Sequence, residues 1–177
     1  MQPPKDFFRP LALGAPMPVR EVPARPSRMI HFFDPSNEKM AAKVPDIAKK
    51  ADVVLGNLED AISADKKEAA REGLVSIAQA TDFGETQLWT RINSLDSPWC
   101  LPDLIRLGPA IGHKLDVIMV PKVEGAEDIH YIDRLLAQLE AQAGLERPIL
   151  VHALLETARG VAHVEEICGA SPRMQGL

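Results

Sequence analysis

The chain has 177 residues, 46% of them hydrophobic and 25% charged, which is typical of one soluble globular domain with a sizeable core. A formal net charge of −5 without any run of lysine or arginine excludes the basic stripe of a nucleic-acid-binding protein. Two cysteines are too few for a disulfide framework. No stretch approaches the roughly 20 apolar residues that span a bilayer, and the N-terminus lacks the continuous apolar core of a signal peptide. We therefore expect a cytoplasmic protein without a membrane span.

The first 27 residues are rich in proline, which forbids helix and disfavours the interior of a strand. We therefore expect residues 1–27 to form an extended arm and residues 28–177 to form the folded domain. The prolines of the arm are Pro3, Pro4, Pro10, Pro16, Pro18, Pro23 and Pro26.

From residue 28 onward, short apolar runs alternate with segments whose apolar residues recur at helical spacing. We predict strands at 29–33, 53–58, 87–92, 117–120 and 149–155, with a sixth opening at 174–177. We predict helices at 66–79, 101–107, 127–143 and 161–168. Segment 38–50 is also helix-like, but Pro45 predicts two short pieces or one kinked helix.

Near-continuous apolar strands separated by helices are typical of a parallel α/β fold. The repeat of about 30 residues fits the roughly 250 residues of an eight-unit (β/α)8 TIM barrel. The chain would supply about five and a half of these units, so we expect it to be a truncated barrel. A doubly wound open sheet is the alternative, but no glycine-rich dinucleotide fingerprint follows the first predicted strand.

Charged side chains follow four consecutive predicted strands, and among them are four acids and two bases. Because the carboxyl ends of parallel strands meet at one mouth of such a fold, where its chemistry is done, we expect these side chains to form a site. They are Glu59, Asp60, Arg91, Lys122, Glu124 and Glu156.

Glu156 is the best single candidate for a metal ligand, because it follows a buried strand in the string LLETARG. Mg²⁺ prefers oxygen ligands and often keeps waters while it takes one or two carboxylates. Gly160, in the helix that follows, would permit close approach and leave backbone N–H groups free for an anion. Glu59 and Asp60 either orient metal-bound waters or simply place negative charge at the start of a helix.

Arg91 lies inside a predicted strand and presents a planar fork that suits a carboxylate or a developing oxyanion. A structural ion pair is the alternative for this arginine. Lys122 is either a contact for an anion or the ion-pair partner of Glu124.

Four strings, in this order, resemble the citrate lyase β-subunit/malyl-CoA lyase group of the HpcH/HpaI aldolase superfamily. The resemblance implies a (β/α)8 barrel in a homo-oligomer and a Mg²⁺ site that Mn²⁺ could also fill. It further implies reversible Claisen or aldol chemistry on an acyl-CoA thioester and a 2-oxo acid such as glyoxylate. The strings are NLEDAISADKKEAAR at 57–71, RINSLDSPW at 91–99, PKVEGAEDI at 121–129 and LLETARGVAHVEEICGASPR at 154–173.

Some residue roles follow from this resemblance. Glu156 matches the first metal-ligand glutamate of the family, and Arg91 matches the arginine that contacts substrate and stabilises the enolate oxygen. Glu59 and Asp60 match the acidic pair close to the metal, which we count with Arg91 as catalytic.

Further matches surround the first strand. Phe32 matches a residue near bound substrate or CoA, and Lys39 matches a basic residue of that region. The family's second metal-ligand aspartate follows strand six, so we expect it beyond residue 177. The chain departs from the family at Asn57, where an aspartate is usual, and at 34–37, which replace a G-x-R-P loop without its arginine.

The function that the resemblance implies is a Mg²⁺-dependent carbon–carbon lyase. It would cleave or form a β-hydroxyacyl-CoA of the malyl-CoA or methylmalyl-CoA type. Citryl-CoA cleavage and malyl-CoA thioester hydrolysis are alternatives on the same barrel. The two departures from the family pattern leave a non-catalytic barrel subunit or binding protein as an alternative of another class.

Overall fold

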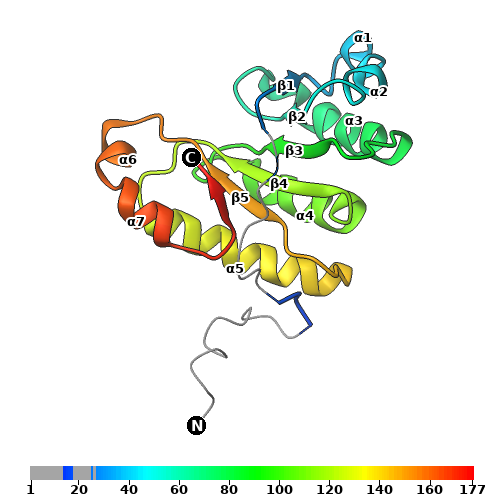
Figure 1. Cartoon of the computed structure of the whole chain (residues 1–177). Coiled ribbons are helices and arrows are strands. Elements are labelled where there is room, and N and C mark those ends of the chain that lie inside the picture. The colour runs from blue at the N-terminus through cyan, green and yellow to red at the C-terminus, as the bar shows by residue number, and fades with distance from the viewer. Residues whose placement is uncertain (1–13, 18–24, 26) are drawn as a thin grey trace.

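The computed structural model describes residues 14–17, 25 and 27–177, so most of the predicted arm lies outside the described residues (Figure 1). Six parallel strands form one sheet in the order β1-β2-β3-β4-β5-β6. They are β1 (Ile30–Phe33), β2 (Val53–Asn57), β3 (Gln87–Arg91), β4 (Leu115–Val120), β5 (Leu150–Ala153) and β6 (Met174–Gly176).

Each strand pairs in parallel with the next strand of the sequence, so β1 and β6 are the two edges of the sheet. This order never reverses, whereas a doubly wound sheet reverses at its switch point. The predicted parallel α/β fold is confirmed. Closure into an eight-stranded barrel, and the truncation of that barrel, stay predictions.

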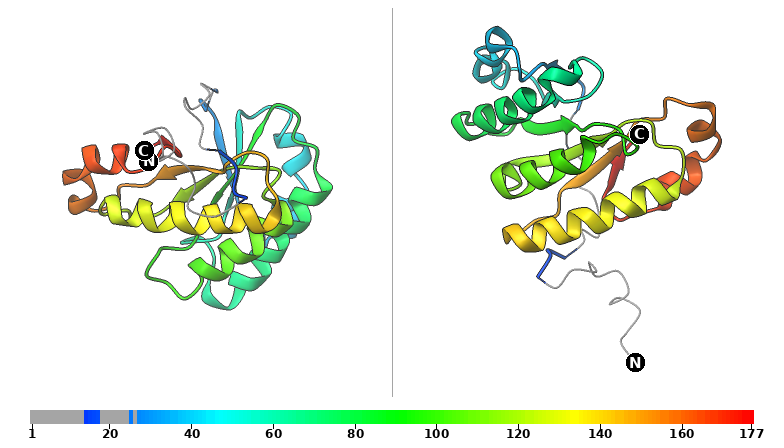
Figure 2. Two further views of the ribbon diagram at one scale, coloured as in Figure 1. Left: turned by 90° about the horizontal axis from the view of Figure 1, so that it is seen from below. Right: turned by 180° about the vertical axis from the view of Figure 1, so that it is seen from behind.

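Helices connect the strands, and α3, α4 and α5 lie side by side over one face of the sheet (Figures 1 and 2). None of the helices in the described part of the chain is both long enough and apolar enough to cross a membrane. The helices are α1 (Glu38–Ala41), α2 (Val44–Ile47), the 3-10 turn η2 (Ala64–Lys66), α3 (Lys67–Ala80), α4 (Cys100–Ile111), α5 (Ala126–Ala143), α6 (Ala158–Ala162) and α7 (Val164–Gly169).

Proline shapes two of these helices. Pro45 lies in the first turn of α2, where the helix needs no N–H donor at this position. Segment 38–50 forms two short helices, α1 and α2, which is the first of the two predicted alternatives. The helix predicted at 101–107 was too short, because α4 continues through Pro109 to Ile111. Pro109 lies on the exposed side of α4, while Leu107 and Ile111 remain buried against the sheet and hold the last turn in place.

The helix predicted at 161–168 was wrong, because the structure has two helices that meet at His163. The backbone of His163 leaves the helical region, with φ −102° and ψ 18°. Its ring Nδ1 lies 2.8 Å from the carbonyl oxygen of Glu124, a residue of the loop after β4. This tertiary contact has no counterpart in the local hydrophobic spacing from which one helix was predicted.

The two faces of the sheet carry separate apolar clusters. The larger cluster fills the space between the sheet and the helices and includes Leu74, Leu104 and Ile132. The smaller cluster lies on the other face and includes Leu55, Trp89, Val117 and Met119. Because side chains alternate along a strand, Arg91 shares this second face with Trp89. On this second face, the apolar cluster therefore lies next to the charged residues at the carboxyl ends of the strands.

Candidate functional site

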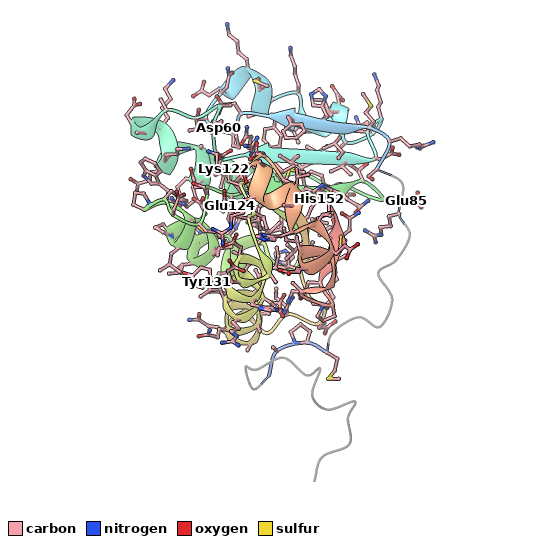
Figure 3. All side chains as sticks on the ribbon, turned by 90° about the vertical axis from the view of Figure 1, so that its left-hand side faces the viewer. Asp60, Glu85, Lys122, Glu124, Tyr131 and His152 are labelled. Carbon is pink, nitrogen blue, oxygen red and sulfur yellow. The ribbon has the colours of Figure 1, made fainter. Side chains whose placement is uncertain are left out.

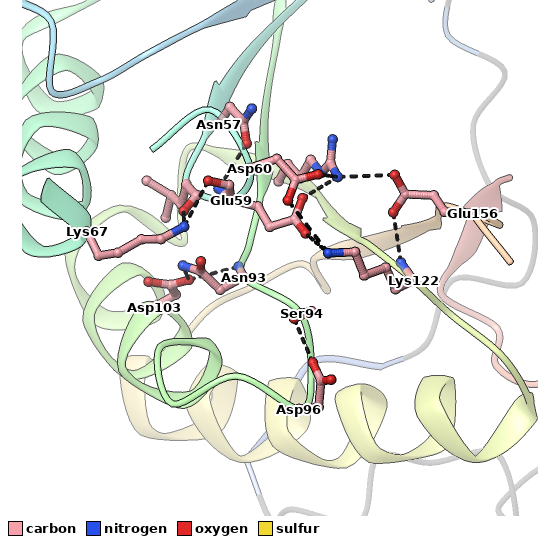
Figure 4. Close-up of polar contacts among 12 residues, drawn as sticks. Asn57, Glu59, Asp60, Lys67, Asn93, Ser94, Asp96, Asp103, Lys122 and Glu156 are labelled. Carbon is pink, nitrogen blue, oxygen red and sulfur yellow. Dashed lines mark hydrogen bonds and ion pairs between the residues drawn. The ribbon is translucent and has the colours of Figure 1, made fainter. Parts of the chain in front are cut away.

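Three acidic and two basic side chains meet beyond the carboxyl ends of β2 to β5 (Figure 4). Asp60 and Lys122 lie close together in Figure 3, whereas Glu85, in the loop before β3, lies well away from them. The structure thus brings together the strand ends that the sequence singled out. The five residues are Glu59 and Asp60 after β2, Arg91 at the end of β3, Lys122 after β4 and Glu156 after β5.

Arg91 contacts all three carboxylates. Its Nη2 lies 3.2 Å from Asp60 Oδ2 and 3.2 Å from Glu156 Oε1, and it forms a close ion pair with Glu59 Oε2. The Arg91 side chain is only 13% exposed. Its Nε is buried and has no hydrogen-bond partner among the described residues, so one donor of the guanidinium remains unused. A bound anion would satisfy such a donor.

Lys122 contacts the same carboxylates from the opposite side. Its ammonium donates to Glu59 Oε1 at 2.8 Å and lies 3.6 Å from Asp60 Oδ1, and its backbone N–H donates to Glu156 Oε2 at 3.1 Å. The suggested pairing with Glu124 was wrong, since none of the ion pairs in the described structure joins the two side chains.

The backbone of Lys122 explains how it reaches Glu156. Just beyond the last pair of the β4–β5 ladder, Leu154 donates to the Val120 carbonyl and accepts from the N–H of Val123. These two bonds leave the N–H of Lys122 outside the pairing of the strands. Lys122 adopts a left-handed conformation with φ 55°, which costs a residue with a Cβ roughly 1–2 kcal/mol. The conformation turns the Lys122 N–H out of the ladder and toward Glu156.

Glu59 is the buried centre of the cluster, with 5% of its side chain exposed. Asn57 Oδ1 accepts a hydrogen bond from the Glu59 N–H at 2.9 Å, and Lys67 Nζ donates to the carbonyls of Leu58 and Glu59, each at 2.8 Å. Burial lowers the pKa of the Lys67 ammonium, against the pull of nearby acids. Asn57, one of the departures from the family pattern, therefore fixes the turn that carries Glu59.

Electrostatics favour the charged forms of Lys122 and Asp60. The hydrogen bond to Glu59 raises the pKa of the Lys122 ammonium. Desolvation raises the pKa of the Asp60 carboxyl, but the Lys122 charge, a hydrogen bond with Glu59 and the Arg91 charge outweigh it, so that pKa lies below its ordinary value. The five side chains of the cluster carry three formal negative charges and two formal positive charges.

Glu156 and Asp60 are the carboxylates that solvent reaches, with 35% and 62% of their side chains exposed. Among the described residues, no three acidic, histidine or cysteine side chains are placed so that together they could hold a metal ion. A Mg²⁺ ion that keeps several waters and takes one or two carboxylates fits this donor set, whereas a metal enclosed by protein ligands does not.

The close approach predicted for Gly160 is present, but its N–H does not remain free. A Cβ at Gly160 would lie 2.3 Å from the carbonyl oxygen of Val123, so glycine lets α6 approach the loop after β4. Its N–H donates to Thr157 Oγ1 at 3.1 Å and caps α6. The glycine thus sets the position of α6, the helix that follows Glu156.

The two residues suggested near β1 lie apart from this cluster. Phe32 is exposed on β1, in register with Leu55, and shares the face of the sheet that leads to Arg91. Lys39 is exposed in α1, and no hydrogen bond or ion pair of the described residues joins it to the cluster. Their binding roles stay predictions.

A cavity of about 330 Å³ adjoins the cluster at Lys122. It leaves room for part of a ligand beside the carboxylates. The lining residues include Ser94, Asp96, Lys122, Glu124, Thr157 and Arg159.

Residues 28–177 match the family model described as HpcH/HpaI aldolase/citrate lyase. The chain is 58% identical over 172 residues to a malyl-CoA/β-methylmalyl-CoA/citramalyl-CoA lyase of Chloroflexus aurantiacus, an alignment that covers 97% of this chain and 49% of the relative. It is 36% identical to the citrate lyase subunit β of Leuconostoc mesenteroides subsp. cremoris, over 85% of this chain and 49% of the relative. The chain thus spans about half the length of the curated relatives it matches.

The chain is also similar to a solved structure. Protein CitE from Mycobacterium tuberculosis, in complex with magnesium, acetoacetate and coenzyme A, superposes with a TM-score of 0.59. The match covers 81% of this chain and 45% of that one, at 29% sequence identity.

Proposed function

The chain belongs to the HpcH/HpaI aldolase/citrate lyase family, and from this premise we propose that it is a Mg²⁺-dependent carbon–carbon lyase. Its proposed substrates are a β-hydroxyacyl-CoA of the malyl-CoA or methylmalyl-CoA type, or glyoxylate and an acyl-CoA in the reverse direction. The Chloroflexus relative, a malyl-CoA/β-methylmalyl-CoA/citramalyl-CoA lyase at 58% identity, supports this substrate class.

One observation carries the proposal most directly. Glu156 and Arg91 come from strands that are not neighbours, yet their side chains lie 3.2 Å apart. The acidic ligand and the guanidinium that the family resemblance implies therefore share one site. The solved structure of CitE contains magnesium, which supports Mg²⁺ as the cofactor.

In this proposal Glu156 would hold the metal, and Asp60 would orient waters on it. Bound Mg²⁺ would supply a Lewis acid and a template for the carboxylate and the adjacent oxygen of the substrate. Arg91 offsets the negative charge that develops on the thioester oxygen as the carbon–carbon bond breaks. Glu59 holds Arg91 in place through their ion pair.

The proposal also carries over features that lie beyond these residues. They are a second metal-ligand aspartate after strand six, a base that takes the hydroxyl proton, closure of the sheet into a (β/α)8 barrel, and a homo-oligomeric assembly. Phe32 and Lys39 keep their suggested roles near bound substrate or CoA.

Citryl-CoA cleavage is the second candidate, because the Leuconostoc relative is a citrate lyase subunit. Product analysis with Mg²⁺ separates the candidates. Malyl-CoA should yield glyoxylate and acetyl-CoA, whereas citryl-CoA cleavage yields oxaloacetate and a thioesterase yields free malate with no glyoxylate. Turnover of none of these thioesters, in a protein that also fails to bind Mg²⁺, would overturn the proposal in favour of a non-catalytic subunit.

A further inference from the structure

Lys122 holds the site by two contacts that are chemically different. Its backbone N–H donates to Glu156 Oε2, a bond that any residue except proline could make at this position. Its ammonium donates to Glu59 Oε1 and lies near Asp60 Oδ1, and these contacts need the lysine side chain. The two contacts can therefore be tested separately by substitution.

We propose that the Lys122 ammonium is a charge-balancing positioning group, which lets an anionic substrate bind beside the three carboxylates at the expense of affinity for the metal. The inference rests on the function proposed above and adds to it a residue that sets the balance between cation and anion binding.

The charge balance of the cluster supports this role. The five side chains carry three formal negative charges and two formal positive charges, and loss of the Lys122 ammonium makes the formal charge of the site one unit more negative. A more negative site attracts a divalent cation more strongly and repels a carboxylate ligand more strongly. The ammonium should therefore move the two affinities in opposite directions.

The position of the ammonium supports it as well. Arg91 is almost wholly enclosed, but 46% of the Lys122 side chain is exposed, and Lys122 lines the 330 Å³ cavity. Ser94 and Asp96, which also line this cavity, are drawn with Lys122 in Figure 4. Four acids line the cavity as well, namely Asp96, Glu124, Glu127 and Asp128, so Lys122 and Arg159 are the lining residues that attract an anion.

A purely structural lysine would behave differently. If the ammonium served only to hold the loops after β2 and β4 together, its loss would loosen Glu59, Asp60 and Glu156 at once. Affinity for the metal and affinity for the anion would then both fall. The direction of the two changes separates the roles, whatever happens to activity.

The test is isothermal titration calorimetry in two stages. Mg²⁺ alone is titrated first, and glyoxylate is then titrated at saturating Mg²⁺. The variants are Lys122→Met, which keeps the length of the side chain without the charge, and Lys122→Arg, which keeps the charge. Lys49→Met is the matched control, because Lys49 pairs with Asp46 in the exposed region before β2.

For Lys122→Met we expect the Mg²⁺ dissociation constant to fall on the order of tenfold. We expect the glyoxylate dissociation constant to rise roughly threefold or more. Changes of this size are expected from the loss of a half-exposed unit charge that water screens. Lys122→Arg should restore glyoxylate binding toward the wild-type value, and Lys49→Met should change neither constant. Weaker binding of both ligands to Lys122→Met, or no change in either, would overturn the inference. Wild-type protein that binds no Mg²⁺ would instead overturn the proposed function.

Discussion

Arg91 reaches three carboxylates through one nitrogen, Nη2, and still has a buried donor unused. Its position at the end of β3 fixes it, since a strand allows little movement of the Cα. A guanidinium cannot lose its proton at neutral pH, so it can balance a charge that appears only in the transition state.

Replacement of Arg91 should therefore lower the turnover number, kcat. We expect Arg91→Ala to lower kcat for malyl-CoA cleavage on the order of 10²-fold or more, as loss of an oxyanion contact does. Arg91→Lys should recover only part of the loss, because an ammonium lacks the planar fork. Circular dichroism should show that both variants fold, and unchanged kinetics in Arg91→Ala would remove this residue from the mechanism.

The two cysteines should differ sharply in reactivity. Burial raises the pKa of the Cys100 thiol to about 12, so at pH 8 almost none of it is thiolate, whereas Cys168 is exposed. Iodoacetamide at pH 8 should add one label to the folded chain, at Cys168, and two after denaturation, as mass spectrometry would show. Rapid labelling of Cys100 in the folded protein would contradict its burial.

At this scale the sequence predicts the residues of the site but not all of their contacts. Glu59, Asp60, Arg91 and Glu156 could be placed together because each lies at, or just after, the carboxyl end of a strand in a parallel sheet. The contacts of Lys122 could not be predicted, since they depend on the left-handed backbone of this residue just beyond the end of β4.

At the scale of elements, α6 is held against the loop after β4 by the absence of a side chain at Gly160. Gly160→Ala would place a Cβ 2.3 Å from the Val123 carbonyl oxygen, so α6 or the loop must shift. We expect the free energy of unfolding in urea to fall by about 1–3 kcal/mol, the usual cost of overpacking. Gly169→Ala is the control, because nothing lies within 4 Å of its added Cβ. Equal stability of the two variants would show that the close approach is unimportant.

A buried ion pair joins α5 to the amino ends of β5 and β6. Arg173 is 4% exposed and donates to both carboxylate oxygens of Glu140, at 2.6 and 2.7 Å, and to the Ile149 carbonyl at 3.0 Å. Arg173→Met would leave the fully buried Glu140 without its charged partner, with only the Ile149 N–H still donating to it. We expect the free energy of unfolding in urea to fall by about 3–5 kcal/mol.

The double variant Arg173→Met/Glu140→Leu is the control for this pair. It removes both charges, so it should be less destabilised than Arg173→Met alone. A double variant as unstable as the sum of the two single ones would show that the residues do not act as a pair.

Hydrophobic spacing predicted nearly all of these elements, because each strand and each long helix buries its own apolar stripe. It failed where a tertiary contact decides the boundary. The break between α6 and α7 depends on His163 and the Glu124 carbonyl, and the last turn of α4 depends on packing beyond Pro109.

At the scale of the whole molecule, the site is non-local. Its five residues span positions 59–156 and come together only because β2, β3, β4 and β5 are consecutive neighbours in one parallel sheet. The parallel order followed from the alternation of strands and helices in the sequence. Closure of the sheet into a barrel stays a prediction, because it depends on register and on contacts between distant units.

The account depends on a divalent cation held by Glu156 beside Arg91. The most direct test is an electron paramagnetic resonance titration with Mn²⁺, which gives a signal when free and which Mg²⁺ should displace from the site. We predict that the wild-type protein binds Mn²⁺ in competition with Mg²⁺ and that Glu156→Gln does not. Equal Mn²⁺ binding by the two proteins would contradict the account, because the cation would then lie elsewhere.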